Sequence, residues 1–464
     1  MTAKHQARFG LRVLLMLGWP VIVTRLTQSV IGFADAYMTA SLGEDALAAT
    51  TTGSFNVFSI VILPMGIAFI VQSFGAQLAG KKDFLGARRY AWYGLILAGL
   101  VTVLGALSTP LIRPLLGLLD YQPAVHDMMS EYLEIRLFAL GGIVGTEVLG
   151  SWYAGLGNTR LQMIAGVVAM LCNVALNWVL IYGNLGAPAL GVEGAALASL
   201  LASWAGFGVL AYVFARGWGT GDATGRIRGK DGLRLSEFFR MLRFGIPNGI
   251  NWFLEMSAFT LFINVVVAGL GTSTLAAMMV VFQINSLAFM PAFGLSSAGA
   301  ILVGQAIGGG RRDEVGQIVW RTVRVASAWH VLVGILYLAI PEQLMDLFDT
   351  STGDSSEFYE LGVLMLAISA AWQLFDAIGM AVGEALRAAG DTSWSMWARL
   401  LVGWLLFIPT AFVSVNLLDG GPIAATLCVV LYLMVIAACI SWRFLSGAWR
   451  HIDLTGDEAA IELV

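Results

Sequence analysis

The sequence predicts an all-α polytopic membrane protein with twelve transmembrane helices in two pseudo-symmetric six-helix bundles. The chain has 464 residues, of which 58% are apolar and 12% are charged. Soluble domains carry about 25% charged residues, so half that share indicates a protein that lies mostly in lipid. Long apolar runs recur along the chain, and its two halves share short motifs in the same order.

The first apolar run, 11–40, resembles a transporter helix more than a simple anchor. As a helix it is long enough to cross a hydrocarbon core of about 30 Å. It contains Arg25, Gln28 and Asp35, and a charged side chain at membrane depth costs about 2.5–3.5 kcal/mol unless it faces a partner or a cavity. Pro20 removes a helical hydrogen bond and should kink the span.

Eleven further apolar runs follow, separated by short polar or Gly-rich joints. No cleavable signal peptide is expected, because the first run is too long and continues as a span. The remaining spans are predicted near 50–78, 90–112, 130–156, 160–183, 189–215, 241–270, 276–307, 317–340, 358–386, 393–418 and 422–445.

Basic residues are sorted to one side of the predicted membrane. Twenty-three of the 26 lysines and arginines, with Arg399 among them, lie at the N-terminus or near alternate span ends. The opposite loops are acidic, as at Glu44 and Asp45. Because cytoplasmic loops are enriched in Lys and Arg, both termini are expected in the cytoplasm.

The halves of the chain repeat. Pro20 and Pro64 match Pro247 and Pro291 at a single offset of 227 residues. LGEDALAA (42–49) matches LGTSTLAA (270–277), GKKDFLG (80–86) matches GRRDEVG (310–316), and AGLGNT (154–159) resembles RAAGDT (387–392).

The repeat divides the chain into two lobes. We expect an N-terminal six-helix lobe at 1–216, a cytoplasmic inter-lobe linker at 217–235 and a C-terminal six-helix lobe at 236–464. Six is an even number, so both lobes enter the membrane in the same direction. Parallel repeats of this kind are related by an axis along the membrane normal, and their binding site lies between them near the midplane.

In the N-terminal lobe, one acid and two amides are predicted at similar depth. With a rise of about 1.5 Å per residue, Asp35 lies about 12 Å from the outer face, and Asn173 and Asn177 lie at about 15 and 9 Å. A carboxylate with amide carbonyls offers hard oxygen ligands for a small cation, or a proton site. The alternative is helix–helix hydrogen bonding by the Asn pair.

Three more acids fall at membrane depth. Glu255 and Asp376 both lie about 16–18 Å from the cytoplasmic side, and if adjacent they could share a proton or a cation. The alternative is two unrelated polar contacts. Arg25 and Glu147 both lie about 20 Å from the inner face, which predicts a contact between them within the first lobe.

Other kinds of site find little support. The cysteines, Cys172, Cys428 and Cys439, lie in apolar runs without disulfide or metal-binding spacing, and the four histidines are scattered. No G-x-x-x-x-G-K-[ST] loop is present, which argues against ATP-driven transport. We find no catalytic constellation and no sizeable extramembrane domain, so an enzyme or a receptor is not expected.

Five stretches carry a resemblance to a known family. They are GWPVIVTRLTQSVIGFADAYMTASLG, CNVALNWVLIYG, LGVEGAALAS, FGIPNGINWFLEMS and WQLFDAIGMAVGEALRAAGDT. Together they resemble the multidrug and toxic compound extrusion (MATE) family, in its NorM-like bacterial branch. The resemblance implies two six-helix bundles around a central cleft, no cofactor, and efflux of cationic amphipathic drugs in exchange for Na+ or H+.

The resemblance also implies site residues. Asp35 would be the N-lobe acid, with Asn173 and Asn177 beside it, and Glu255 and Asp376 would form the C-lobe cation site. Either cluster would bind Na+ if the coupling ion is a metal. The residues expected to line the cavity are Gln28, Asn56, Gln283 and Asn285.

The chain departs from the family at two places. Met278 and Met279 stand where many relatives carry a polar pair, and Arg25 stands where an uncharged residue is expected.

The prediction is therefore a secondary multidrug antiporter. Its expected partners are small-molecule amphipathic cations and the lipid bilayer, with no nucleic acid, and it is expected to be a monomer in the bacterial cytoplasmic (inner) membrane. The alternative is a lipid-linked oligosaccharide flippase, which would favour a strongly cationic cleft. The choice between Na+ and H+ stays open, because a carboxylate cluster serves either.

Overall fold

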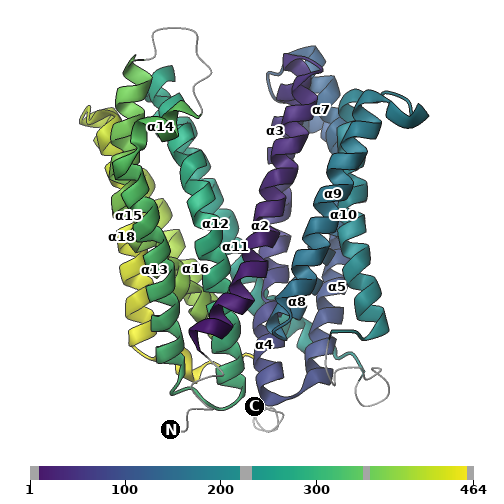
Figure 1. Cartoon of the computed structure of the whole chain (residues 1–464), viewed down its shortest axis with the longest axis vertical. Helices are drawn as coiled ribbons and strands as arrows, with labels where there is room; N and C mark the ends of the chain where they lie inside the picture. The colour runs from purple at the N-terminus through teal and green to yellow at the C-terminus, as the bar shows by residue number, and fades with distance from the viewer. Residues whose placement is uncertain (1–9, 220–231, 348–355, 457–464) are drawn as a thin grey trace. The chain divides into compact units, whose positions relative to one another are not determined.

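The computed structural model describes residues 10–219, 232–347 and 356–456, and the regular structure of this part is entirely helical (Figure 1). The all-α prediction is therefore confirmed. The helices of the first half are α2 (Leu11–Ala40), α3 (Glu44–Phe69), α4 (Val71–Lys81), α5 (Phe84–Ser108), α6 (Ile112–Leu116), α7 (Pro123–Arg136), α8 (Leu140–Gly155), α9 (Thr159–Tyr182) and α10 (Gly191–Arg216).

The second half begins after the linker. Its α-helices are α11 (Leu235–Leu261), α12 (Thr272–Gly308), α13 (Val315–Ala339), α14 (Pro341–Asp346), α15 (Ser356–Ala389), α16 (Thr392–Leu400), α17 (Ile408–Phe412) and α18 (Gly421–Leu445). Three π-helical stretches extend them, namely η5 (Phe262–Val267), η7 (Leu401–Phe407) and η8 (Val413–Leu417).

Eleven helical stretches in the described residues are long and apolar enough to cross a membrane. They correspond to the predicted spans with one exception, 130–156. There the chain forms α7, a short 3-10 turn η2 (Leu137–Ala139) and α8 in direct succession. The charged residues of α7 make this region less apolar than its neighbours: they include Glu131, Glu134 and Arg136.

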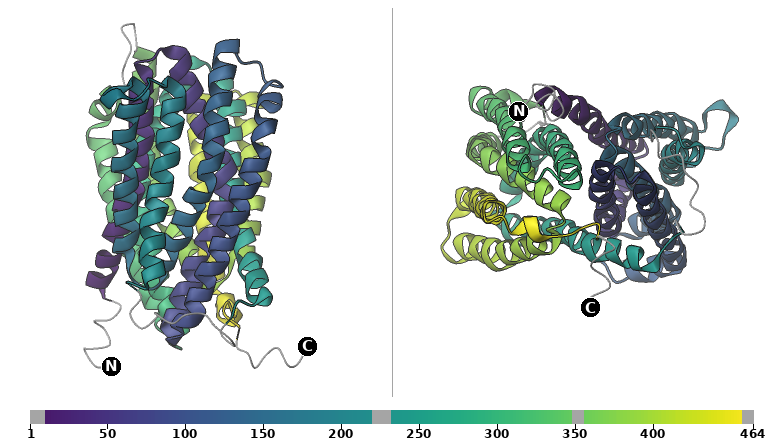
Figure 2. Two further views of the ribbon diagram at one scale, coloured as in Figure 1. Left: turned by 90° about the vertical axis from the view of Figure 1, so that its right-hand side faces the viewer. Right: turned by 90° about the horizontal axis from the view of Figure 1, so that it is seen from below.

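Contacts divide the chain into two units. The N-terminal unit is Val23–Gly249, and the C-terminal unit is Met1–Ile22 with Ile250–Val464. In the N-terminal unit α9 packs on α10, and α8 packs on both α4 and α5. In the C-terminal unit α15 packs on α12, α13 and α18. Within each unit the long helices run side by side along one direction (Figure 2).

The boundaries of these units fall inside two helices rather than in the linker. Residues up to Ile22 of α2 pack with the C-terminal unit, where Gly294 of α12 lies against Ile22. Residues of α11 up to Gly249 pack with the N-terminal unit. The expected linker, 217–235, lies mostly outside the described residues, as do Lys4, Arg8, Arg226, Arg228 and Lys230 of the charge count.

The four repeated prolines occupy the interiors of four long helices. Pro20 lies in α2, Pro64 in α3, Pro247 in α11 and Pro291 in α12. The equivalent helices nevertheless differ, because α3 ends at Phe69 whereas α12 continues to Gly308.

Two glycines bring the backbones of α3 and α11 together in the N-terminal unit. A Cβ at Gly66 would lie 2.6 Å from Gly249 Cα, and a Cβ at Gly249 would lie 2.5 Å from the Leu63 carbonyl oxygen. Asn248 Nδ2 donates a hydrogen bond to the Gly66 carbonyl at 2.6 Å. The obstacles are mostly backbone atoms, which cannot move aside as a flexible side chain can.

We expect Gly66→Ala to destabilise the protein by about 1–3 kcal/mol, the usual cost of overpacking a close contact. Gly99→Ala is the matched control, because a Cβ at Gly99 meets nothing within 4 Å. The thermal stability of detergent-purified protein would be compared, and equal losses for both variants would contradict the close packing of α3 on α11.

Candidate ion and proton sites

Asp35 lies in a buried cage of hydrogen-bond donors. Its side chain comes from α2 and is buried, with 7% of its surface exposed. From α9, Asn173 Nδ2 and Asn177 Nδ2 donate to Asp35 Oδ1 at 3.0 and 2.6 Å. Ser199 Oγ of α10 donates to Asp35 Oδ2 at 2.8 Å. Three donors on two helices therefore converge on one carboxylate.

The cage is also connected internally. Asn173 Nδ2 lies 3.1 Å from Ser199 Oγ, and Asn177 Nδ2 lies 3.3 Å from Asn173 Oδ1. Within the described residues, Asn177 Oδ1 is buried and has no hydrogen-bond partner. The amides thus present nitrogen to the carboxylate, not the carbonyl oxygens that a metal ion would require.

Arg25 and Glu147 form a buried ion pair in the N-terminal unit, as predicted from their depth. Their nitrogen and oxygen atoms lie 3.5 Å apart, and the side chains are 8% and 3% exposed. Ser151 Oγ donates to the same carboxylate at 3.0 Å, and Arg25 Nη1 lies 3.5 Å from Gln28 Oε1. The predicted contact is confirmed.

Glu255 in the C-terminal unit has a partner that the sequence did not suggest. Arg399 of α16 pairs with it directly, through Nη1 and Oε1. Asp376 of α15 is close enough to interact electrostatically with both groups. Arg399 was expected only as a basic residue near a span end, and its ion pair with Glu255 was not predicted.

The residues expected to line a cavity have varied surroundings. Gln28 and Gln283 are exposed within their own units. Asn56 Nδ2 donates to Met129 Sδ at 3.6 Å. Asn285 is occupied within its unit, donating to Ser369 Oγ at 3.3 Å and accepting from Trp372 Nε1 at 3.2 Å and from Gln373 Nε2.

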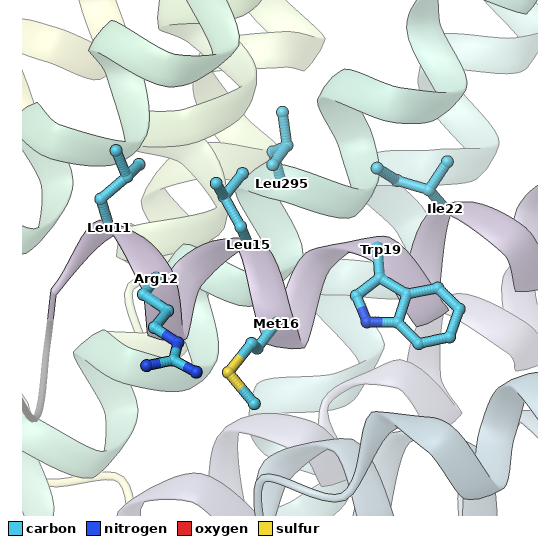
Figure 3. Close-up of a pocket in the computed structure, with 7 residues that line it drawn as sticks. All are labelled: Leu11, Arg12, Leu15, Met16, Trp19, Ile22 and Leu295. Atoms are coloured by element: carbon cyan, nitrogen blue, oxygen red, sulfur yellow. The ribbon is translucent and has the colours of Figure 1, made fainter.

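A groove of about 670 Å³ runs along the start of α2 in the C-terminal unit. Figure 3 shows Leu15 and Leu295 on one side of α2, with Arg12 and Met16 pointing to the other. Its lining is apolar except for Arg12, so the groove has no acid to bind a cation. Among the described residues, no group of three or more His, Cys, Asp or Glu could hold a metal ion.

Two site residues were missed at the level of sequence. Ser199 ends the LGVEGAALAS stretch, but a serine in an Ala-rich helix gives little indication of a partner. Arg399 carried a clearer signal. It lies nine residues beyond Gly390, or about 14 Å along a helix, which is similar to the depths of Glu255 and Asp376.

Two curated proteins are similar to this chain over most of their length. A protein described as probable multidrug resistance protein NorM, from Thermotoga maritima, is 27% identical over 97% of this chain and 95% of its own length. A protein of the same description from Rhizobium meliloti is 28% identical over 93% of this chain and 92% of its own length.

Solved structures share the fold. A MOP superfamily transporter from Pyrococcus furiosus superposes with a TM-score of 0.86 at 21% identity, over 97% of this chain and 100% of that one. An outward-facing multidrug resistance MATE family transporter gives a TM-score of 0.85 at 22% identity and the same coverage. The MatE family model matches residues 20–179 and 249–413. Since these two segments include more than half of the residues, the chain belongs to the MatE family and is a multi-pass membrane transporter rather than an enzyme.

Proposed function

We propose that this protein is a secondary multidrug efflux antiporter that exports amphipathic organic cations in exchange for protons. The family supports transport, and the names of the NorM relatives support multidrug efflux. The observation that carries the proposal is the Asp35 cage. In it, a buried carboxylate on one membrane-spanning helix accepts hydrogen bonds from three donors on two other helices. An ionisable group within a membrane span is energetically costly, and such groups usually mark an ion or substrate pathway.

The donor arrangement favours H+ over Na+ at Asp35. Binding Na+ would require Asn173 and Asn177 to turn their carbonyl oxygens inward, with loss of both hydrogen bonds to the carboxylate. Binding a proton requires a smaller rearrangement of the amides than binding Na+. Rotation of the Asn177 amide would bring its Oδ1, which has no partner in the described residues, toward the new Asp35 hydroxyl.

Coupling requires that the proton and the drug favour opposite states of the transporter, because a ligand with equal affinity for both states shifts nothing. Each proton that enters a cell with a negative interior gains about 2.3 kcal/mol per 100 mV of membrane potential. We infer that protonation of Asp35 rearranges the α2–α9 contacts and weakens drug binding on the outer side. The proton then leaves on the cytoplasmic side.

The flippase alternative receives less support. A pyrophosphate-linked lipid needs unneutralised positive charge, whereas the candidate cleft residues are mainly acids, with Arg25 the one basic exception at the level of sequence. In the N-terminal unit, Arg25 forms an ion pair with Glu147.

The cellular setting is also part of the proposal. We place the protein in the bacterial cytoplasmic membrane as a monomer, with both termini in the cytoplasm and lipid as its surroundings. The support is the excess of Lys and Arg on one set of loops, together with the eleven helical stretches of spanning length.

Transport in reconstituted vesicles tests the function and the ion together. We expect a fluorescent organic cation to accumulate in vesicles with an acidic interior when ΔpH is imposed alone and the membrane potential is clamped. A Na+ gradient imposed alone should give no accumulation. Accumulation driven only by Na+ would overturn the proton assignment, and failure of both gradients would overturn the antiporter.

A further inference from the structure

The ion pair between Arg399 and Glu255 has no role in the proton cycle described above. Both groups lie in the C-terminal unit, and neither is fully buried: the side chains of Arg399 and Glu255 are 16% and 33% exposed. A third ionisable group, Asp376, lies close enough to interact electrostatically with both. The cluster therefore combines two acids with one permanent cation.

We propose that Arg399 is a tethered cation that occupies the acid pair Glu255–Asp376 and excludes Na+ from it. This inference rests on the proposed function only in treating those acids as a potential ion site. Arginine keeps its charge at any physiological pH, so it neutralises one carboxylate permanently. A Na+ ion could bind between the acids only by displacing the guanidinium from Glu255.

Local structure holds Arg399 in this position. It lies near the end of α16, and the π-helical stretch η7 (Leu401–Phe407) begins two residues later. From η7, Trp404 Nε1 donates to the Leu254 carbonyl at 3.3 Å, directly before Glu255 in the chain. Tyr432 of α18 lies close enough to Arg399 to interact with it electrostatically.

Arg399 therefore lies beside a π-helical stretch, and such stretches are frequently found at functional sites. The Trp404 side chain is hydrogen-bonded to the α11 backbone beside the ion pair, so Arg399 has little freedom to leave Glu255 in this state. Its Nε has no hydrogen-bond partner in the described part of the chain. The guanidinium is therefore held mainly by contacts at its outer end.

Equilibrium binding of radioactive Na+ to the full-length protein in lipid nanodiscs tests this proposal without transport. All samples carry Asp35→Asn, which removes the acid of the N-terminal unit. Arg399→Gln should create saturable Na+ binding with an affinity at least about tenfold above that of the parent. Adding Glu255→Gln to Arg399→Gln should abolish the new site.

Two variants serve as controls. Arg443→Gln removes an arginine from another ion pair of the same unit, that with Asp391 at 2.7 Å, and should leave Na+ binding at the parent level. Arg399→Lys keeps a cation at the position and should also exclude Na+.

Two results would overturn the proposal. One is Na+ binding in folded Arg399→Gln that equals the parent. The other is saturable Na+ binding by the parent protein that is lost on Glu255→Gln. This second comparison does not require the Arg399→Gln variant to fold. Because binding is measured without transport, failure of the drug antiporter hypothesis would leave the result intact, and the reverse also holds.

Discussion

Asp35→Asn is expected to reduce proton-driven efflux to the leak rate of vesicles without protein. An amide at position 35 cannot take up a proton, so the step that links ΔpH to drug movement would be lost. It would also place an amide nitrogen among donors that now converge on a carboxylate, namely those of Asn173, Asn177 and Ser199. Accumulation of a fluorescent organic cation under an imposed ΔpH measures the effect.

The control for this substitution is Asp45→Asn. Asp45 lies exposed in the first turn of α3, so the same chemical change there should leave transport unaltered. Because its amide is neutral, as protonated Asp35 is, Asp35→Asn purified in detergent should bind drug more weakly than the parent protein. Full ΔpH-driven transport by Asp35→Asn at equal protein content would remove Asp35 from the mechanism.

Arg25→Met is expected to destabilise the protein by about 3–5 kcal/mol, the usual consequence of removing one partner from a buried ion pair. Glu147 would then be a buried carboxylate whose hydrogen-bond donor in the described residues is Ser151. Glu147→Gln should cost less, because a neutral amide can still accept a hydrogen bond from Arg25. Thermal unfolding of detergent-purified protein would rank the variants.

A double-mutant cycle separates charge from packing. The variant Arg25→Met/Glu147→Gln removes both charges and should recover much of the stability lost in Arg25→Met, since replacement of a whole buried pair is often tolerated. If the two effects simply add, then the groups, though 3.5 Å apart, are not energetically coupled.

The sequence could predict the depth of each site residue along its helix. The rise per residue placed Arg25 level with Glu147, and it placed Asp35 between Asn173 and Asn177; in each case the side chains are in contact. Depth is a single coordinate, however. Which way a side chain faces around the helix axis depends on packing, and for this reason the partners Ser199 and Arg399 were not identified.

In the fold, too, features set by local sequence could be predicted, and features set by contacts between distant residues could not. Apolar runs and prolines are local signals, and the long helices follow them closely. The broken helix at 130–156 reflects the polar character of its first part, which average hydropathy over the whole run conceals. The assignment of half of α2 and half of α11 to opposite units arises from contacts between distant residues, and no repeat in the sequence indicates it.

That exchange of helix halves has a consequence for how the chain can be divided. A cut between Gly217 and Arg234, although it lies between the two repeats, would leave each fragment with a helix segment whose packing partners are on the other fragment. Neither gene half would encode a self-sufficient protein, and function would require both fragments to be made together.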